Sequence, residues 1–217
     1  MCTESRMYIA IEGVIGVGKT TLARLLQPTF DAEVLLEIFE ENPFLSDFYG
    51  DRDRYAFQTQ MFFLLSRYHQ QRRNVPELLA KNENLLSDYT FAKDSLFASI
   101  NLDGDELEMY GRVHEALAEK IRHPDLLVFL RAENQTLMER IAMRDRPYER
   151  DMDSGYIADL GRTYAEFFSK PYNNTPVLTI DTDDLDFVRS PDDLKFIKAR
   201  IEKALKETPL QPELLDK

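Results

Sequence analysis

Cysteine and positive charge are both scarce in this 217-residue chain, and each shortage excludes a class of protein. The one cysteine, Cys2, can form neither an internal disulfide framework nor a cysteine-based zinc site. Lys and Arg number 27 against 39 Asp and Glu, whereas a nucleic-acid surface needs clustered cations to neutralise phosphates. These shortages predict a reducing, cytoplasmic setting and no nucleic-acid polymer as a partner.

Long apolar runs are also absent. No stretch of about 18 consecutive apolar residues occurs, so the sequence predicts no membrane partner and no membrane span. Residues 1–11 carry Glu4 and Arg6 without a long apolar core, and we therefore expect no signal peptide there. With 43% hydrophobic residues the chain can bury a full core, which predicts a single domain over residues 1–217 with a polar tail at about 208–217.

Short apolar runs alternate with longer helical patterns along the whole chain. The runs occupy residues 7–11, 33–36, 84–87, 126–130 and 177–180. The helical patterns cover residues 20–27, 55–73, 75–81, 107–122, 134–144, 154–169 and 191–206. This alternation predicts an α/β fold with a five-stranded, parallel, doubly wound sheet flanked by helices. Because ligands bind at the carboxyl ends of such strands, the residues after each strand are the candidates for function.

Residues 12–21, EGVIGVGKTT, lie between the first predicted strand and the first predicted helix. They contain the spacing G-x-x-x-x-G-K-[ST], in which backbone N–H groups and a helix N-terminus surround phosphates while Lys contacts phosphate and Thr contacts Mg²⁺. A plain glycine-rich turn has no need of Lys-Thr at that offset. The pattern predicts a P-loop that binds ATP or another nucleoside triphosphate through Gly13, Gly16, Gly18, Lys19, Thr20 and Thr21.

Glu37 follows the second predicted strand, near the phosphate loop that follows the first. A hydroxyl acceptor benefits from a carboxylate that takes its proton during attack on phosphorus, so Glu37 is a candidate general base. The alternative is a solvated acidic loop, an interpretation that suits the neighbouring Glu40 and Glu41 better.

Asp88 ends the third predicted strand. A carboxylate at this point is typical of the residue that holds Mg²⁺ together with the P-loop hydroxyl, here Thr20. A helix N-cap Asp is the structural alternative, because many strand-to-helix turns carry one.

Arginines gather in a segment of this otherwise acidic chain, at about residues 140–152. Arg140 and Arg144 share one helix face, and Arg146 lies in the loop that follows. Such a segment suits a lid that closes on the triphosphate and stabilises the charge of the transferring group, so these arginines are candidate catalytic residues. A solvated, salt-bridged helix face is the alternative, since acidic residues surround them.

Six stretches, in this order, resemble the deoxynucleoside kinase family, specifically its bacterial deoxyadenosine/deoxyguanosine kinase branch. The resemblance covers residues 8 to about 201, through residues 11–20, 37–49, 57–67 (FQTQMFFLLSR), 88–98, 140–149 and 181–187 (DTDDLDF). It implies an enzyme of nucleotide salvage that uses ATP and Mg²⁺ to phosphorylate the 5′-hydroxyl of deoxynucleosides. The implied substrate is deoxyadenosine first, with deoxyguanosine or deoxycytidine as alternatives, and the implied assembly is a homodimer.

The resemblance also assigns roles to single positions. Glu37 resembles the base for the 5′-hydroxyl, Gln60 the amide that reads the nucleobase edge, and Tyr49 with Glu149 the pair that binds the sugar 3′-hydroxyl. The substrate-binding residues implied in this way are Tyr49, Gln60, Arg67, Asp88, Asp94 and Glu149. Gln58 is an alternative to Gln60, although the seven-residue offset to Arg67 favours Gln60.

The loop at residues 181–187 resembles the one beside the donor's adenine, which makes Asp184 and Phe187 candidates for donor binding. A solvent-facing acidic turn is an equal alternative for this loop. One departure from the family pattern is Tyr89, where many members have Arg after the acidic residue of the third strand. The missing cation is then expected from the lid.

Two rival functions share the P-loop. A thymidylate kinase-like nucleoside monophosphate kinase resembles this chain at Glu12-Gly13, but that class uses an Asp-Arg pair where this chain has Asp88-Tyr89. A non-catalytic GTP-binding switch would carry an N-K-x-D tetrad for guanine, and the sequence has none.

Overall fold

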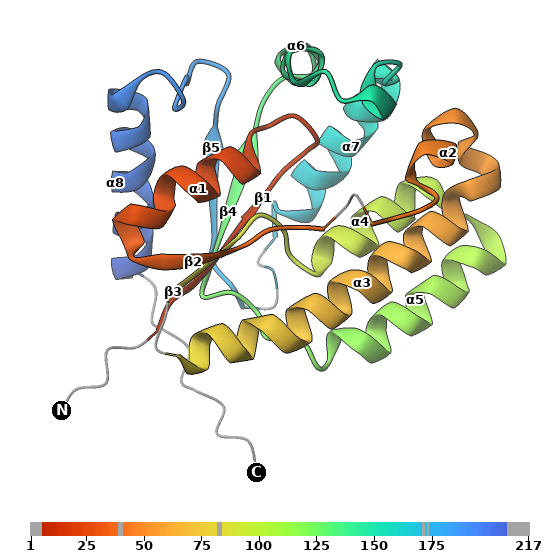
Figure 1. The fold of residues 1–217 in the computed structure, drawn as a ribbon, viewed down its shortest axis with the longest axis horizontal. Coiled ribbons are helices and arrows are strands. Elements are labelled where there is room, and N and C mark those ends of the chain that lie inside the picture. Colours follow the sequence, from red (N-terminus) through yellow and green to blue (C-terminus); the bar gives the residue numbers. More distant parts are fainter. Residues whose placement is uncertain (1–5, 39–40, 82–83, 171, 173, 208–217) are drawn as a thin grey trace.

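The computed structural model describes residues 6–38, 41–81, 84–170, 172 and 174–207, and its centre is a parallel sheet. The strand order is β2-β3-β1-β4-β5, and all four pairings are parallel (Figure 1). The strands are β1 (Tyr8–Glu12), β2 (Ala32–Leu35), β3 (Asn84–Ser87), β4 (Leu126–Arg131) and β5 (Val177–Asp181). This sheet confirms the predicted α/β fold, and each strand begins and ends within one residue of its apolar run.

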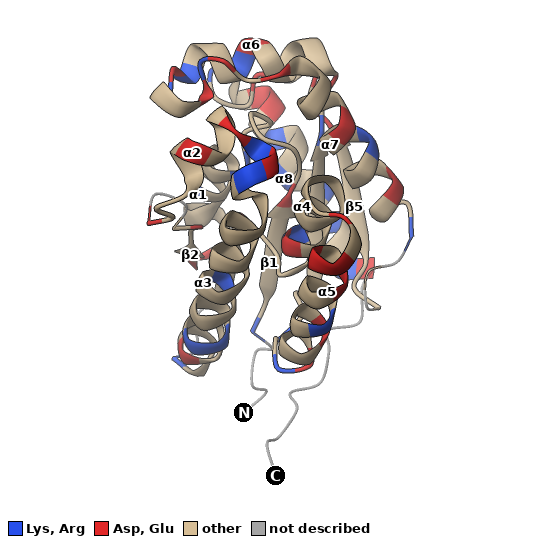
Figure 2. Ribbon diagram, turned by 90° about the vertical axis from the view of Figure 1, so that its right-hand side faces the viewer, with Lys and Arg blue, Asp and Glu red and all other residues tan. Residues whose placement is uncertain are grey.

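Helices cover both faces of the sheet, as Figures 1 and 2 show from two directions. One face carries α1 (Lys19–Phe30) and α8 (Pro191–Glu207). The other face carries α3 (Arg52–Ala80), α4 (Ala92–Asn101), α5 (Gly104–Ala118) and α7 (Ser154–Phe167). Three further elements near the carboxyl ends of the strands are α2 (Leu45–Gly50), α6 (Asn134–Arg144) and the 3₁₀ turn η1 (Pro147–Glu149). The two-sided cover leaves β1 and β4 almost wholly buried, as near-continuous apolar strands require.

The predicted helices at 55–73 and 75–81 are one helix, α3. Pro76 lies inside it, yet Val75 and Leu79 are buried and continue the apolar face of the preceding turns. Packing of that face against the sheet offsets the hydrogen bond that proline removes. The prediction of two separate helices over these residues was therefore wrong.

Two helices, α2 and α4, were missing from the sequence expectations. Helix α2 is only 6 residues long, too short for a clear period. Helix α4 buries the charged residues Lys93 and Asp94 beside apolar ones, so its buried face does not read as an apolar stripe. Both helices border the functional site, where charged groups face inward because they have partners there.

Candidate functional site

A cavity of about 830 Å³ opens at the carboxyl ends of the strands. The P-loop, the ends of β2 and β3, and helices α2, α3, α4 and α6 contribute to its walls, together with the loop between β5 and α8. The predicted site residues in its lining are Gly16, Gly18, Lys19, Thr20, Thr21, Glu37, Tyr49, Arg67, Asp88, Arg140, Arg144, Arg146, Glu149, Asp184 and Phe187. Gly13, Gln60 and Asp94 lie behind this lining rather than in it.

The P-loop closes tightly around its lysine. Gly13 has a φ of 149°, and a Cβ there would lie 2.4 Å from the carbonyl oxygen of Leu130, so a side chain is excluded. Lys19 Nζ donates to the carbonyl oxygens of Gly13 at 2.7 Å and Val14 at 3.1 Å. Burial and the nearby cation of Lys93 together lower the pKa of Lys19 to about 8. A phosphate in the cavity would reverse this penalty by supplying negative charge.

Thr20 and Asp88 meet as the sequence predicted for a magnesium site. Thr20 Oγ1 donates to Asp88 Oδ2 at 2.5 Å, and the backbone N–H of Glu37 donates to Asp88 Oδ1 at 2.8 Å. A hydroxyl and a carboxylate are the hard oxygen ligands that Mg²⁺ prefers. No group of three or more His, Cys, Asp or Glu side chains suited to a metal occurs among the described residues. The two residues therefore fit a Mg²⁺ that takes its other ligands from phosphate oxygens and water.

Glu37 is held between two cations. Its Oε1 accepts from Arg67 Nε at 2.9 Å and also from the terminal NH2 of Arg67, while its Oε2 accepts from Lys93 Nζ. Burial would raise the pKa of Glu37, but the charges and hydrogen bonds of Arg67 and Lys93 outweigh it and hold that pKa far below its usual range. The carboxylate thus stays ionised and faces the cavity as a fixed hydrogen-bond acceptor.

Behind Glu37 lies a buried polar pocket on α3 and α4. Arg67 also donates to Asp94 Oδ1, and Asp94 is fully buried. Asp94 Oδ2 and the amide oxygen of Gln60 have no hydrogen-bond partner among the described residues. Because an unpaired buried acceptor costs about 1–3 kcal/mol, both atoms are suited to a ligand's donors. Gln60 is 2% exposed on the face of α3 that carries Arg67, whereas Gln58 is exposed, which favours Gln60 over its alternative.

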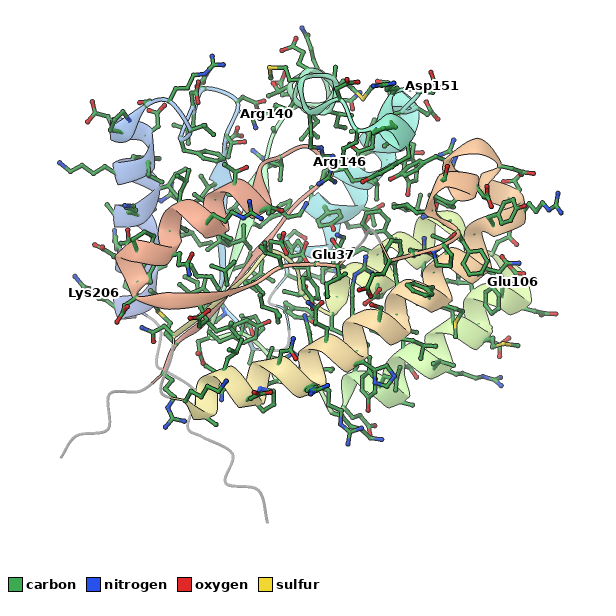
Figure 3. The ribbon with its side chains drawn as sticks, in the orientation of Figure 1. Glu37, Glu106, Arg140, Arg146, Asp151 and Lys206 are labelled. Carbon is green, nitrogen blue, oxygen red and sulfur yellow. The ribbon has the colours of Figure 1, made fainter. Side chains whose placement is uncertain are left out.

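The lid arginines are each engaged by the protein itself. Arg140 donates to Thr182 Oγ1 at 3.0 Å and to the Thr182 carbonyl at 2.7 Å, so it holds the loop after β5. Arg144 donates twice to Glu149 Oε2, at 3.1 and 2.5 Å, and Arg146 lies 3.6 Å from Glu149 Oε1. Figure 3 shows Arg140 and Arg146 on the α6 side of the site and Glu37 across from them. Phosphate contact by these arginines requires an exchange of partners and stays a prediction.

Aromatic rings line the cavity at two places. The ring of Phe187 packs on Gly18, where a Cβ would lie 2.8 Å from it, so the β5–α8 loop is seated directly on the P-loop. The rings of Tyr49 and Tyr148 stack with centroids 6.0 Å apart. Tyr148 also lines the cavity, although no sequence argument singled it out.

Lys93 is the main residue that sequence reasoning missed. It is 7% exposed, lines the cavity and donates to Glu37. The available signal was a lysine inside the matching stretch 88–98, next to a predicted substrate contact. Tyr89, by contrast, is fully buried and its hydroxyl donates to Gln70 Oε1 at 2.5 Å, outside the cavity lining.

The family model for "Deoxynucleoside kinase" matches residues 9–206. The chain belongs to the deoxynucleoside kinase family. It is therefore a kinase, and the resemblance found in the sequence is confirmed. The parallel sheet and the P-loop agree with this family, and the role of Glu37 stays a prediction.

Named relatives agree with this assignment. A deoxyguanosine kinase of Bacillus subtilis (strain 168) is 34% identical over 201 residues, covering 91% of this chain and 97% of its own length. A deoxyadenosine kinase of Dictyostelium discoideum is 32% identical over 200 residues, covering 90% and 79%. The structure of deoxyadenosine kinase from M. mycoides with bound dATP has a TM-score of 0.78 and 26% identity, covering 91% of this chain and 100% of that one.

Proposed function

We propose that this chain transfers the γ-phosphoryl group of ATP to the 5′-hydroxyl of purine deoxynucleosides. The observation that carries the proposal is the hydrogen-bonded series from Thr20 through Asp88 to Glu37, which connects the P-loop with an ionised carboxylate in one cavity. A donor phosphate bound to the P-loop and an acceptor hydroxyl bound to Glu37 would therefore lie close enough for direct transfer.

Each group has a distinct task in this reaction. Lys19 and the backbone of the P-loop bind the donor phosphates, and Thr20 with Asp88 would hold Mg²⁺, which supplies positive charge to the phosphates. Glu37 orients the 5′-hydroxyl and accepts its proton as the oxygen bonds to phosphorus. Arg144 and Arg146 exchange Glu149 for the transferring group when the lid closes.

The purine preference rests on the buried pocket behind Glu37. An amide such as that of Gln60 offers a donor beside an acceptor, which matches the donor and acceptor on the edge of adenine. The unpaired Asp94 Oδ2 adds an acceptor, which suits the N–H donors of guanine. The names of the relatives divide between deoxyadenosine and deoxyguanosine kinase, in line with a pocket that takes either purine.

A substrate panel tests the proposal. The purified chain is incubated with ATP-Mg²⁺ and each of the deoxynucleosides and their 5′-monophosphates, and products are resolved by chromatography. We expect monophosphates from deoxyadenosine and deoxyguanosine, and a smaller yield from deoxycytidine. Diphosphates formed only from monophosphates would instead identify a nucleoside monophosphate kinase, and no product from any acceptor would leave a nucleotide-binding switch.

Two further expectations concern the setting of the protein. Among the described residues, none of the helices is both long and apolar enough to cross a membrane. The cytoplasmic location that the cysteine content suggests stays a prediction. So does the homodimer that the family resemblance implies, and sedimentation of the purified chain would test it.

A further inference from the structure

Lys93 is a buried cation that the proposed mechanism leaves without a task. It lies in the first turn of α4 and is 7% exposed, and lysines are rarely buried to this extent unless they are paired. The one hydrogen-bond partner of its ammonium group among the described residues is Glu37, through Oε2. Two of its three N–H donors therefore remain available to a ligand.

Lys93 lies beside Glu37, where the acceptor hydroxyl is expected, and in one cavity with the P-loop, where the phosphate donor is expected. It lines the same cavity as Lys19, Thr20 and Asp88. Two ammonium groups that line one cavity favour an anion bound between them. The γ-phosphoryl group of a donor on the P-loop is such an anion.

Other cations at this place are already committed. Arg67 binds Glu37 Oε1 and Asp94, and Arg140 holds the loop after β5. Arg144 pairs with Glu149 and, in the proposed mechanism, reaches the transferring group only when the lid closes. Position 89, where many family members have Arg, carries a tyrosine that is turned toward Gln70. Lys93 has a flexible side chain and two N–H donors without a hydrogen-bond partner among the described residues, and it lies beside Glu37, the candidate general base.

We propose that Lys93 is a catalytic residue of the phosphoryl transfer, binding the γ-phosphoryl oxygens during the step in which Glu37 receives the substrate's proton. The proposal rests on the proposed function. In this step the 5′-oxygen forms a bond to the γ-phosphorus while the bond from that phosphorus to the β,γ-bridging oxygen breaks, and its electron pair stays on ADP. The hydroxyl proton moves to Glu37 Oε2, and Lys93 keeps its protons.

The hydrogen bonds of Glu37 explain why phosphate binding by Lys93 is coupled to proton transfer to Glu37. Oε1 is held by Arg67, so Oε2 is the atom left for the substrate hydroxyl, and Lys93 occupies it. A shift of the ammonium group toward the donor phosphate gives Oε2 to the hydroxyl. The same movement leaves Glu37 Oε2 without its lysine partner, so that oxygen is available to accept the hydroxyl proton.

The first test compares Lys93→Met with Lys93→Arg and with the control Lys81→Met, a lysine on the protein surface. We expect Lys93→Met to lower kcat by about 10²–10³-fold, the usual effect of removing a donor aimed at transition-state charge, with little change in the nucleoside KM. Lys93→Arg should recover part of the loss because it keeps the charge, and Lys81→Met should match wild type. Lys93→Gln replaces Lys93→Met if the latter does not melt cooperatively.

The second test distinguishes contact with phosphate from mere positioning of Glu37. Calorimetry measures the Kd of a non-hydrolysable ATP analogue and of ADP, each with Mg²⁺, because only the analogue carries the γ group. We expect Lys93→Met to weaken the analogue by about tenfold while ADP binds as before, a loss of about 1.4 kcal/mol. The double variant Glu37→Gln/Lys93→Met should also be slower than Glu37→Gln alone.

The role of Lys93 is overturned if Lys93→Met binds the ATP analogue and ADP with the same ratio of Kd values as wild type. It is also overturned if the kcat of the double variant equals that of Glu37→Gln. The wild-type substrate panel separates this failure from that of the proposed function. If the wild type phosphorylates no nucleoside, the proposed function is wrong. If the wild type is active and Lys93→Met equals it, only the inference about Lys93 is wrong.

Discussion

The acceptor end and the lid end of the cavity hold their charges differently. At the acceptor end the side chains of Glu37, Arg67, Lys93 and Asp94 are between 0% and 11% exposed and form one connected network. At the lid end the side chains of Arg144 and Arg146 are 35% and 31% exposed, and both pair with the single carboxylate of Glu149. Buried charges interact strongly and resist separation, whereas partly solvated pairs are weak and exchange easily.

This difference separates two tasks of a kinase. The acceptor end must place a hydroxyl and a base edge before the reaction, so a fixed network with few alternatives suits it. In the proposed mechanism the predicted lid opens for ATP and ADP in each cycle, and arginines that can change partners at small cost suit that movement. The following variants break or sharpen the comparison, beginning with the largest expected effect.

Glu37→Gln tests the acceptor end most severely. It should lower kcat by about 10²–10⁴-fold, because the amide cannot accept the hydroxyl proton. It should also lower the melting temperature, because it leaves Lys93 and one side of Arg67 without a carboxylate in a buried network. Glu41→Gln, in the exposed part of the same segment, is the matched control. Near-normal turnover of Glu37→Gln would show that Glu37 is not the general base.

Gln60→Glu tests the reading of the base. The carboxylate offers only acceptors, which penalises the ring nitrogen of adenine and favours the N–H donors of guanine. The ratio of kcat/KM for deoxyadenosine and deoxyguanosine should shift by about 10- to 100-fold toward deoxyguanosine. The exposed Gln58→Glu should leave the ratio unchanged. If instead Gln58→Glu shifts it and Gln60→Glu does not, the two residues exchange roles.

Arg140→Ala tests the donor side. It removes the hydrogen bonds that seat the β5–α8 loop on the site, each worth about 1 kcal/mol, so the KM for ATP should rise by about tenfold. The KM for the nucleoside should remain as in wild type. Arg131→Ala removes an exposed pair with Asp181 near the same loop and is expected to change neither KM. An equal effect of both variants would show that Arg140 has no particular role.

The pH profile of donor capture tests the charge of Lys19 and has the smallest expected effect. Burial lowers the pKa of Lys19 to about 8, so its charge is present below that pH and lost above it. Between pH 7 and 8.5 the kcat/KM for ATP should fall by about fourfold as Lys19 deprotonates. In Lys19→Arg, overall slower, this decline should disappear because guanidinium keeps its proton. A flat wild-type profile would contradict the lowered pKa.

The sequence by itself determined the sheet, the P-loop and the family. Strand β4 lies within one residue of its predicted bounds, 126–130, because a strand buried on both faces consists of consecutive apolar residues. The P-loop is equally local, since its spacing, its glycines and its lysine all lie within nine residues of each other. Glu37 and Asp88 followed from topology, because strand ends in a parallel sheet gather at one edge.

Only the tertiary structure decided which charges meet. Lys93 and Glu37 are 56 positions apart, and Arg140 and Thr182 are 42 apart. No local period encodes such pairs, because they depend on how α4 and α6 pack against distant segments. The same holds for the unbroken helix α3, where packing outweighs the local effect of Pro76. Local patterns thus specified the strands and most of the helices, and long-range packing specified their charge partners, since a buried charge is stable only where a distant partner reaches it.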